Sequence, residues 1–457
     1  MVTRHKQAVG SLFRVALGNF AMNDERRPFG FWTTTALVVG GMIGAGIFVL
    51  PSQMARFGWT GMVAWIIGGA SALIIARVLS AVAEARPNEP GLIAVIGEVL
   101  GPVLGVLVGW GAWVGCWVSN AYLALTAVRY AGSIWPLLIE SPTRQALYAS
   151  AIIAILTALN LASLRGSGRF QVVMTILKLL PLAAVLLILA WLTAQGGAAF
   201  TMQQHPPFAL SDLFAAITLV FVAIVGFESA SIAASRVRNP KQNISRATMI
   251  GVALTCVIYI AVCSGIVFVL PQSQVAASTA PVALFVSQFL GGWAGDAVAL
   301  FAVISVVGCL GVWILMQSEI PLALVRARLL PEWVGRTNKH DIAAAPLVIG
   351  SSLTVVLLLL ASWRSGAALM DFMLNLTAVT SVWLYAFACM TALKLHVRRG
   401  FAVFGLLFCL GIFYGAGAEP VLLSISLLLA ALPLYWIARR SLVSSAKSSA
   451  TTAGPTG

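Results

Sequence analysis

Two ionisable side chains lie in stretches of sequence that are otherwise apolar. Glu228 follows Ala223-Ile-Val-Gly-Phe, and Lys178 lies within Met174-Thr-Ile-Leu-Lys-Leu-Leu-Pro. Because an ionised group is unfavourable in hydrocarbon surroundings, such residues usually serve a function. Glu228 could carry a proton, couple a local break to closure of a gate, or only hold neighbouring helices by hydrogen bonds. Lys178 could exchange a proton, act as a fixed cation, or extend its ammonium to the cytoplasmic interface.

Glycines gather near both places where chemistry is expected. Gly40, Gly41, Gly44 and Gly46 crowd one apolar stretch, and Gly226 stands two residues before Glu228. Glycine is a poor helix former, so both stretches can unwind locally. Unwound backbone inside a membrane is tolerated only around a protected polar cavity. The alternative for the first cluster is close packing of helices through small residues.

A broken helix offers backbone groups of both polarities. The second half begins with free N–H groups that attract a carboxylate, and the first half ends with free C=O groups that attract an ammonium. A free α-amino acid carries both charges at a suitable spacing. We expect the donors from about Gly44 to Gly46 and the acceptors from about Gly41 to Ile43.

Helices that cross a membrane must position these residues. The 457 residues are 60% hydrophobic and 9% charged, with a mean hydropathy of +0.96, which a soluble domain with a polar surface could not accommodate. Apolar windows of about twenty residues suit about 30 Å of hydrocarbon. They predict an all-α integral membrane protein with twelve spans, at 33–56, 60–84, 98–131, 145–163, 169–195, 211–235, 247–271, 281–325, 346–363, 367–394, 400–417 and 420–438. The third and eighth are longer than needed, so we expect them to tilt or protrude.

The two glycine-containing interruptions fall in the first and sixth spans, five helices apart. An odd number of spans inverts a second copy relative to the first, so helices 1 to 5 and 6 to 10 are expected to form an inverted repeat. Both breaks can then meet at the middle of the bilayer. The expected parts are an amino-terminal segment at 1–32, repeats at 33–195 and 211–394, helices 11 and 12 at 400–438, and a disordered tail at 439–457.

The formal charge of +14 is explained by where the basic residues lie. They follow the even-numbered spans, as Arg236, Arg238, Lys241 and Arg246 do after the sixth. Cytoplasmic loops carry such an excess, so we expect a multi-pass protein of the cell membrane with both termini in the cytoplasm. The lipid bilayer, not a nucleic acid, is the expected environment of these charges.

Several other classes of chemistry find no support. The six cysteines are scattered without CxxC spacing, so neither disulfides nor a metal site is expected. The four histidines fall in tails or loops. No nucleotide-binding GxxxxGK[ST] motif occurs, and the spans hold no pairing of nucleophile and base. We therefore expect no cofactor and no enzyme activity.

Short motifs in a fixed order resemble the amino acid/polyamine/organocation superfamily and, within it, the basic amino acid/polyamine antiporter family. The resemblance covers most of the chain from about Thr33 to Leu395. It rests on Gly-Met-Ile-Gly-Ala-Gly-Ile-Phe (41–48) with Leu50-Pro51, Cys-Trp-Val-Ser-Asn (116–120), Gly-Phe-Glu-Ser-Ala-Ser (226–231), Arg-Asn-Pro-Lys-Gln-Asn (238–243) and Gly-Cys-Leu-Gly (308–311). It implies a fold of the leucine-transporter type, with alternating access around helices 1 and 6 and a homodimer contact through helices 11 and 12.

The resemblance also implies which residues contact a substrate. The helix 1 backbone would hold the ammonium and carboxylate, Asn120 and Thr377 would be polar positions, and Trp313 would be an aromatic wall. The implied substrate positions are Gly41, Ile43, Gly44, Ala45, Gly46, Asn120, Val222, Gly226, Trp313 and Thr377. Asn120 could instead form a hydrogen bond between helices, and Trp313 could be a packing residue. Tyr122, Trp113, Trp117 and Arg129 are expected to be packing residues or interface anchors.

The chain departs from the arginine/agmatine antiporters of that family at two places. They have a tryptophan six residues before the glutamate, where this chain has Val222, so a flat face for a guanidinium is missing. They have a small apolar residue at the position of Lys178, whereas in other relatives a lysine there resembles a replacement for a bound sodium ion. We therefore expect a secondary transporter of amino acids or amines, by exchange or with protons. The alternatives are a one-way exporter of neutral amino acids and a sensor that does not transport.

Overall fold

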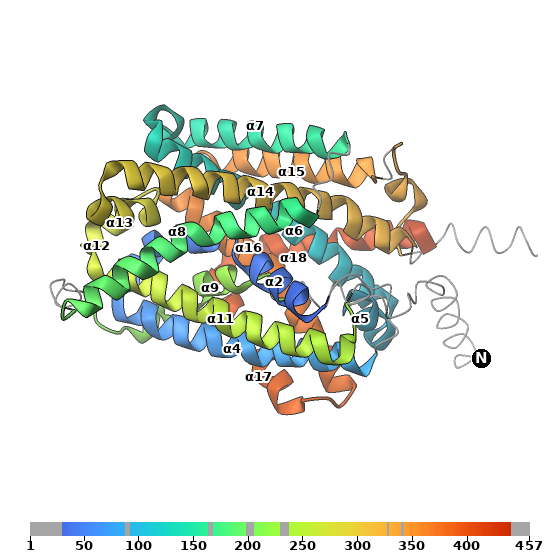
Figure 1. Cartoon of the computed structure of the whole chain (residues 1–457). Coiled ribbons are helices and arrows are strands. Elements are labelled where there is room, and N and C mark those ends of the chain that lie inside the picture. The colour runs from blue at the N-terminus through green and yellow to red at the C-terminus, as the bar shows by residue number, and fades with distance from the viewer. Residues whose placement is uncertain are drawn as a thin grey trace, which may run out of the picture.

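The computed structural model is a bundle of helices whose long members run roughly along one common direction (Figure 1). The structure describes residues 30–86, 92–162, 168–197, 205–228, 237–326, 329–339 and 342–439. The expected amino-terminal segment and carboxy-terminal tail therefore lie almost wholly outside the described residues. Within these ranges the chain forms helices and short turns, and an isolated bridge joins Thr337 and Ala343.

Ten helical segments are long and apolar enough to cross a membrane in the part of the chain that the structure describes. They are Gly46–Ala85, Pro102–Ile134, Pro142–Leu161, Leu177–Ala194, Gln242–Val269, Gly292–Val325, Ala344–Ala361, Gly366–Lys394, Arg399–Ala416 and Ala418–Arg439. Shorter apolar helices cover Phe31–Met42, Leu210–Ile224 and Pro281–Leu290. The prediction of an all-helical membrane protein is thereby supported at the level of about ten long spans with shorter helices beside them.

The elements carry the labels of Figure 1. They are α2 (Phe31–Met42), α3 (Gly46–Met54), η2 (Ala55–Phe57), α4 (Gly58–Ala85), α5 (Leu92–Leu100), α6 (Pro102–Ile134), η3 (Pro136–Ile139), α7 (Pro142–Leu161), α8 (Gly168–Ala194), α9 (Leu210–Ile224), α11 (Pro240–Val269), α12 (Gln272–Ala277), α13 (Pro281–Leu290), α14 (Gly292–Arg326), η6 (Glu332–Gly335), α15 (Ala344–Ala361), α16 (Gly366–Lys394), α17 (Arg399–Ala416) and α18 (Ala418–Leu429).

Local sequence sets several of these boundaries. Helices α6, α7, α11 and α13 begin with proline in the first turn, where the N–H that proline lacks would have no partner within the helix. Ser141 caps α7, because its side chain accepts a hydrogen bond from the backbone N–H of Arg144.

The predicted first span is two helices. The first half, α2, ends at Met42, and α3 begins at Gly46, with Ile43, Gly44 and Ala45 between them. In Figure 1, α2 lies between α8 and α11. The residues of α3 are all buried. The interruption falls inside the glycine cluster from which it was predicted.

The predicted sixth span is also interrupted. Helix α9 ends at Ile224, and residues 225–228 form a turn that includes Gly226 and Glu228. The remainder of the predicted span, residues 229–235, lies outside the described residues.

The predicted spans at 98–131 and 281–325 each contain a turn near their start, but α6 (33 residues) and α14 (35 residues) are still longer than a membrane requires, so their tilt or protrusion stays a prediction. Gly101 separates α5 from α6, and Gly291 separates α13 from α14, with φ of 110° and 89°. These values lie in the region where only glycine is unstrained. Apolar residues continue through both turns, so hydropathy alone does not reveal them.

The two turns are alike in their packing. A Cβ added to Gly105, four residues after Gly101, would lie 2.7 Å from the Cα of Gly97. A Cβ added to Gly295, four residues after Gly291, would lie 2.7 Å from the Cβ of Ser287. The same offset of four residues on either side of the turn occurs in both halves of the chain.

The core is built around the long helix α6. It packs against α14 and α16, while α4 packs against α11 and α9. In Figure 1, α7 and α15 lie side by side along one side of the bundle, and α17 lies at the opposite side. Large apolar side chains are exposed around the bundle, among them Leu187, Val257, Leu360, Leu407 and Leu422. Such exposure suits a protein surrounded by lipid tails.

Candidate functional site

The helix 1 break leaves backbone groups of both polarities without backbone partners. The N–H of Ile43 donates to the carbonyl oxygen of Val39 (2.9 Å) and that of Gly44 to Met42 (2.8 Å). Within the described ranges, the N–H groups of Ala45, Gly46 and Ile47 have no backbone partner, and the carbonyl oxygens of Gly41 and Ile43 accept no hydrogen bond. The expected donors and acceptors therefore lie within a few residues of each other.

One of these N–H groups faces a side chain. The hydroxyl of Tyr122 in α6 lies beside the N–H of Gly46. Tyr122 was expected to be a packing residue, and it is buried, but its hydroxyl also borders the break. A hydroxyl is a neutral acceptor, and a carboxylate is the stronger acceptor for such an N–H group. Tyr122 therefore lies at the pole where a carboxylate is expected.

Lys178 lies against the carbonyl end of α2. Its Nζ donates to the carbonyl oxygen of Gly40 at 3.3 Å, and the residue is 2% exposed. The side chain comes from α8 and so joins the fifth predicted span to the first. Its ammonium is held inside the bundle by a helix terminus, whose partial negative charge suits a cation. The structure does not place it at an aqueous interface.

Two tyrosines that sequence reasoning did not select also bind the interrupted helix. The hydroxyl of Tyr259 in α11 donates to the carbonyl oxygen of Met42 at 2.7 Å. The hydroxyl of Tyr130 in α6 donates to the carbonyl oxygen of Phe48 at 2.6 Å and accepts from the N–H of Val282 at 3.4 Å. Both side chains are fully buried. Tyrosine hydroxyls therefore bind the carbonyl oxygens of Met42 and Phe48, whereas those of Gly41 and Ile43 accept no hydrogen bond from the described residues.

Glu228 closes the break after α9. Its Oε2 accepts hydrogen bonds from the N–H of Gly226 at 2.9 Å and from the hydroxyl of Tyr385 at 2.5 Å. The ring of Phe227 stacks on Tyr385, with centroids 4.9 Å apart and planes 17° apart. Glu228 therefore links the turn to α16, and Tyr385 is a second partner that no sequence pattern singled out.

The interrupted first and sixth spans contact each other closely at two glycines. Gly226 has φ of 116°, and a Cβ there would lie 2.4 Å from the carbonyl oxygen of Gly41. A Cβ on Gly46 would lie 2.9 Å from the Cα of Ala223, one residue after Val222. Since real side chains do not approach backbone so closely, glycine is required at both crossings. The breaks meet in space, as the spacing of the glycines predicted.

Two of the residues that the resemblance implies, on α6 and α16, have side chains without a hydrogen-bond partner among the described residues. Asn120 of α6 is 0% exposed, and neither its Nδ2 nor its Oδ1 has a hydrogen-bond partner among the described residues. Thr377 of α16 is 2% exposed, and its Oγ1 is likewise unpaired within those ranges. Buried polar groups are normally paired. Trp313 of α14 is partly buried and packs against the core.

Asn120 and Thr377 share helix faces with residues near the helix 6 break. Cys116, one turn before Asn120, lies near Glu228. Thr377 is one turn before Ser381, which faces Gly115 of α6, and eight residues before Tyr385. Residues three or four apart share a helix face. Asn120 therefore shares a helix face with Cys116, and Thr377 shares one with Tyr385, the partner of Glu228.

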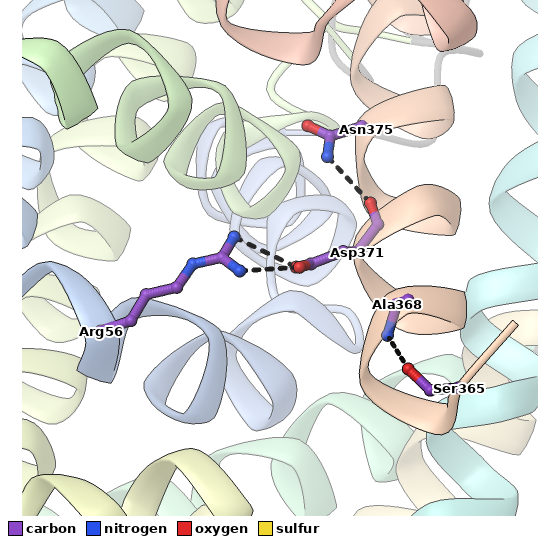
Figure 2. Close-up of polar contacts among 5 residues, drawn as sticks. All are labelled: Arg56, Ser365, Ala368, Asp371 and Asn375. Atoms are coloured by element: carbon purple, nitrogen blue, oxygen red, sulfur yellow. Dashed lines mark hydrogen bonds and ion pairs between the residues drawn. The ribbon is translucent and has the colours of Figure 1, made fainter.

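An ion pair closes the far end of α3. Arg56 in η2 donates from Nη1 to Asp371 Oδ2 (2.7 Å) and from Nη2 to Asp371 Oδ1 (3.3 Å), as Figure 2 shows. The carbonyl oxygen of Asp371 accepts from Asn375 one turn along α16, and Ser365 caps the start of that helix through the N–H of Ala368 (Figure 2). Buried Arg129 donates to the carbonyl oxygen of Gly366 nearby, at 3.3 Å.

Comparison with known proteins agrees with this architecture. The family model described as amino acid permease matches residues 29–452. A cadaverine/lysine antiporter of Escherichia coli K12 is 26% identical over 413 residues, covering 86% of this chain and 91% of the relative. A putative arginine/ornithine antiporter of Bacillus subtilis is 27% identical over 365 residues, covering 73% and 77%. A putative amino-acid transporter of Clostridium perfringens is 23% identical over 453 residues, covering 92% and 93%.

The family model spans nearly the whole chain, and the relatives are matched over most of their own length. The expected absence of enzyme chemistry agrees with a family of transporters. The chain belongs to the amino acid permease family of the amino acid/polyamine/organocation superfamily, a family of multi-pass membrane transporters for amino acids and amines.

Proposed function

We propose that the chain is a secondary active transporter that moves amino acids by alternating access, by exchange or together with protons. The observation that carries this proposal is the helix 1 break, where the N–H groups of Ala45 to Ile47 have no backbone partner among the described residues, and the carbonyls of Gly41 and Ile43 accept no hydrogen bond from them. A carboxylate is attracted to the first set and an ammonium to the second. The named relatives, two of them antiporters, support exchange as the mode of transport.

The proposed architecture has twelve spans, of which the first and sixth are interrupted. The first ten would form two inverted five-helix repeats, with helices 11 and 12 outside them. The matching turns at Gly101 and Gly291 support this arrangement, because each precedes the third helix of its half and packs with the same offsets. The basic loops after even-numbered spans favour both termini in the cytoplasm of a cell membrane.

The exposure pattern supports a state that is closed on the outer side. With the termini inside, α3 is the outer half of helix 1, and its residues are all buried. Gly41 and Gly44 at the break are partly exposed, as are several residues of α2. The ion pair of Arg56 and Asp371 would then close the outer side, and movement of α2 would open the inner side.

Glu228 and Lys178 are proposed as the coupling residues. Both are buried beside the breaks, and each binds a backbone group whose position depends on the break: Gly226 for the carboxylate and Gly40 for the ammonium. A change of protonation at either side chain would therefore alter the hydrogen bonds that hold a broken helix. Lys178 as a fixed cation would bind the end of α2 without a metal ion. A homodimer through helices 11 and 12 is proposed from the resemblance alone.

Purified protein reconstituted in liposomes tests the proposal. Liposomes loaded with an unlabelled amino acid mixture should take up labelled external amino acid, and empty liposomes should take it up only when a pH gradient is imposed. Counterflow separates exchange from net efflux. If no labelled amino acid enters under either condition, although the protein is folded and inserted, the proposed function is wrong.

A further inference from the structure

Asn120 and Thr377, whose side chains have no hydrogen-bond partner among the described residues, are both neutral. Asn120 brings an amide with donor and acceptor, and Thr377 brings a hydroxyl with the same capacity. Buried polar groups are normally paired, so these atoms are available to hydrogen-bond a substrate side chain. Their partner must offer both a donor and an acceptor, without requiring a charge.

The buried carboxylate beside the breaks is already occupied. Glu228 accepts from the N–H of Gly226 and from Tyr385, and among the described residues it is the buried acidic side chain. The undescribed segment after it, residues 229–236, contains no Asp or Glu. Neither the described residues around the breaks nor that segment therefore offers a free acidic group to pair with a cation.

The next acidic side chains along the neighbouring helices do not supply one. Asp371 of α16 is paired with Arg56 and lies six residues before Thr377. Glu319 of α14 lies ten residues beyond Cys309, which faces Gly44, and so about 15 Å farther along the helix axis. Lys178 places its Nζ 3.3 Å from the carbonyl oxygen of Gly40, next to the carbonyl pole.

This distribution of charge has different consequences for different substrates. In a dibasic amino acid, the side-chain cation would be buried without a counter-ion. A diamine lacks the carboxylate that the N–H groups of Ala45 to Ile47 would bind. A neutral polar amino acid satisfies both backbone poles and can give its side-chain amide or hydroxyl to Asn120 and Thr377.

We infer that the site selects α-amino acids with an uncharged, hydrogen-bonding side chain, of the serine, threonine, asparagine and glutamine type, over dibasic amino acids and diamines. This inference rests on the proposed transport function and assigns its substrate class. It sets this chain apart from the substrates in the names of its antiporter relatives.

Competition on reconstituted protein tests the substrate class. Labelled glutamine exchange is measured against unlabelled serine, threonine, asparagine, lysine, arginine, ornithine and cadaverine. The neutral polar compounds are expected to compete at least about thirtyfold more strongly than the charged ones, since an unpaired buried charge costs at least as much as an unpaired polar group. If lysine, arginine or cadaverine competes as well as glutamine, the inference is overturned while the transport function stands. If no amino acid in the panel is exchanged, the transport function itself fails.

Variants of Asn120 and Thr377 provide a second test of the substrate class. Thr377→Val should reduce the preference for serine over alanine by about tenfold, because the substrate hydroxyl loses a partner. Thr391→Val is the matched control, since Thr391 is equally buried on the same helix and bonds only the carbonyl of Phe387. Asn120→Asp should raise competition by lysine relative to glutamine. If neither Thr377→Val nor Thr391→Val changes the serine-to-alanine ratio, Thr377 does not contact the substrate side chain. If Asn120→Asp does not change the lysine-to-glutamine ratio, Asn120 does not contact it either.

Discussion

Arg56 binds both carboxylate oxygens of Asp371 across 315 residues of sequence, and the pair joins the end of the interrupted first helix to α16 (Figure 2). The same helix, α16, carries Thr377 and then Tyr385, which binds Glu228. One helix thus contacts the end of α3, borders the proposed substrate site, and holds the helix 6 break. Outer closure and the break are connected through a single rigid element.

Removal of the ion pair should favour the outward-open state. In Arg56→Ala the end of α3 loses its bidentate contact with Asp371. Because Arg56 is about half exposed, the pair is worth about 0.5–1 kcal/mol, or a two- to fivefold shift in population. The measurement is the rate at which a cysteine introduced at Thr377, in a variant without native cysteines, reacts with an impermeant thiol reagent added outside.

A second ion pair provides the control. Arg364 binds Glu419 between the start of α16 and α18 and makes no ion pair with Asp371, so Arg364→Ala should leave the outer accessibility unchanged. The exchanged pair Arg56→Asp with Asp371→Arg should restore the original rate. Equal effects of Arg56→Ala and Arg364→Ala would show that the bundle had loosened generally and that the pair does not govern closure.

Glu228→Gln tests whether the carboxylate titrates during transport. Glutamine keeps the shape and can still accept from Tyr385, but it cannot ionise. The charged or titratable groups close to it are Tyr385 of α16 and Cys116 of α6. If wild-type exchange changes by about tenfold between roughly pH 5 and pH 8, the variant should change by less than about twofold. Glu84→Gln, at an exposed pair with Arg77, is the matched control. If Glu228→Gln shows the same pH dependence as the wild type, this carboxylate is not the titrating group.

The sequence predicts the interruptions well because glycine carries a local signal. The break at Ile43 to Ala45 and the turn at Gly226 fall where the glycines stand, and both contacts leave no room for a side chain. The separation of α5 from α6 is harder to foresee, because Gly101 lies inside a continuous apolar run. Pro102, at the first position of a helix, is the one cue that could have revealed it.

The tyrosines and the ion pair were missed for a different reason. Tyr130, Tyr259 and Tyr385 bind backbone or carboxylate groups that are distant in sequence. A tyrosine in a spanning helix suits a lipid interface or a packed core equally well, so its type does not reveal a partner. In the sequence alone, Arg56 and Asp371 look like ordinary charged residues of a loop or a helix end. Only the fold brings η2 and the first turns of α16 together, where the two side chains pair.

Lys178→Ala should impair transport more than substrate binding. The ammonium holds the carbonyl oxygen of Gly40 at the end of α2, so its loss frees the inner half of helix 1 without removing the backbone groups of the substrate site. We expect the exchange rate to fall by about tenfold or more while affinity changes by less than about threefold, as expected for a conformational step. Binding is measured by equilibrium dialysis, and exchange is measured in liposomes.

Lys394 provides a matched lysine. It donates to the carbonyl oxygen of Val99 but is exposed, so Lys394→Ala should leave both quantities unchanged. Equal losses of binding and exchange in Lys178→Ala, together with a lowered melting temperature, would assign Lys178 a structural role only.

The contact between Gly46 and Ala223 predicts a strong steric effect of a single methyl group. A Cβ on Gly46 would lie 2.9 Å from the Cα of Ala223, a backbone atom that cannot rotate away. Gly46→Ala must therefore separate α3 from α9 and is expected to lower stability by about 1–3 kcal/mol. Gly311→Ala is the control, because a Cβ at that position would meet no atom within 4 Å. Thermal unfolding in detergent compares the two variants. Since the amide of Gly46 also belongs to the proposed carboxylate site, Gly46→Ala should lose substrate affinity even at temperatures where it stays folded. A folded Gly46→Ala protein with unchanged affinity would show that the two interrupted helices can separate without disturbing the site, and their close crossing would then have no part in shaping it.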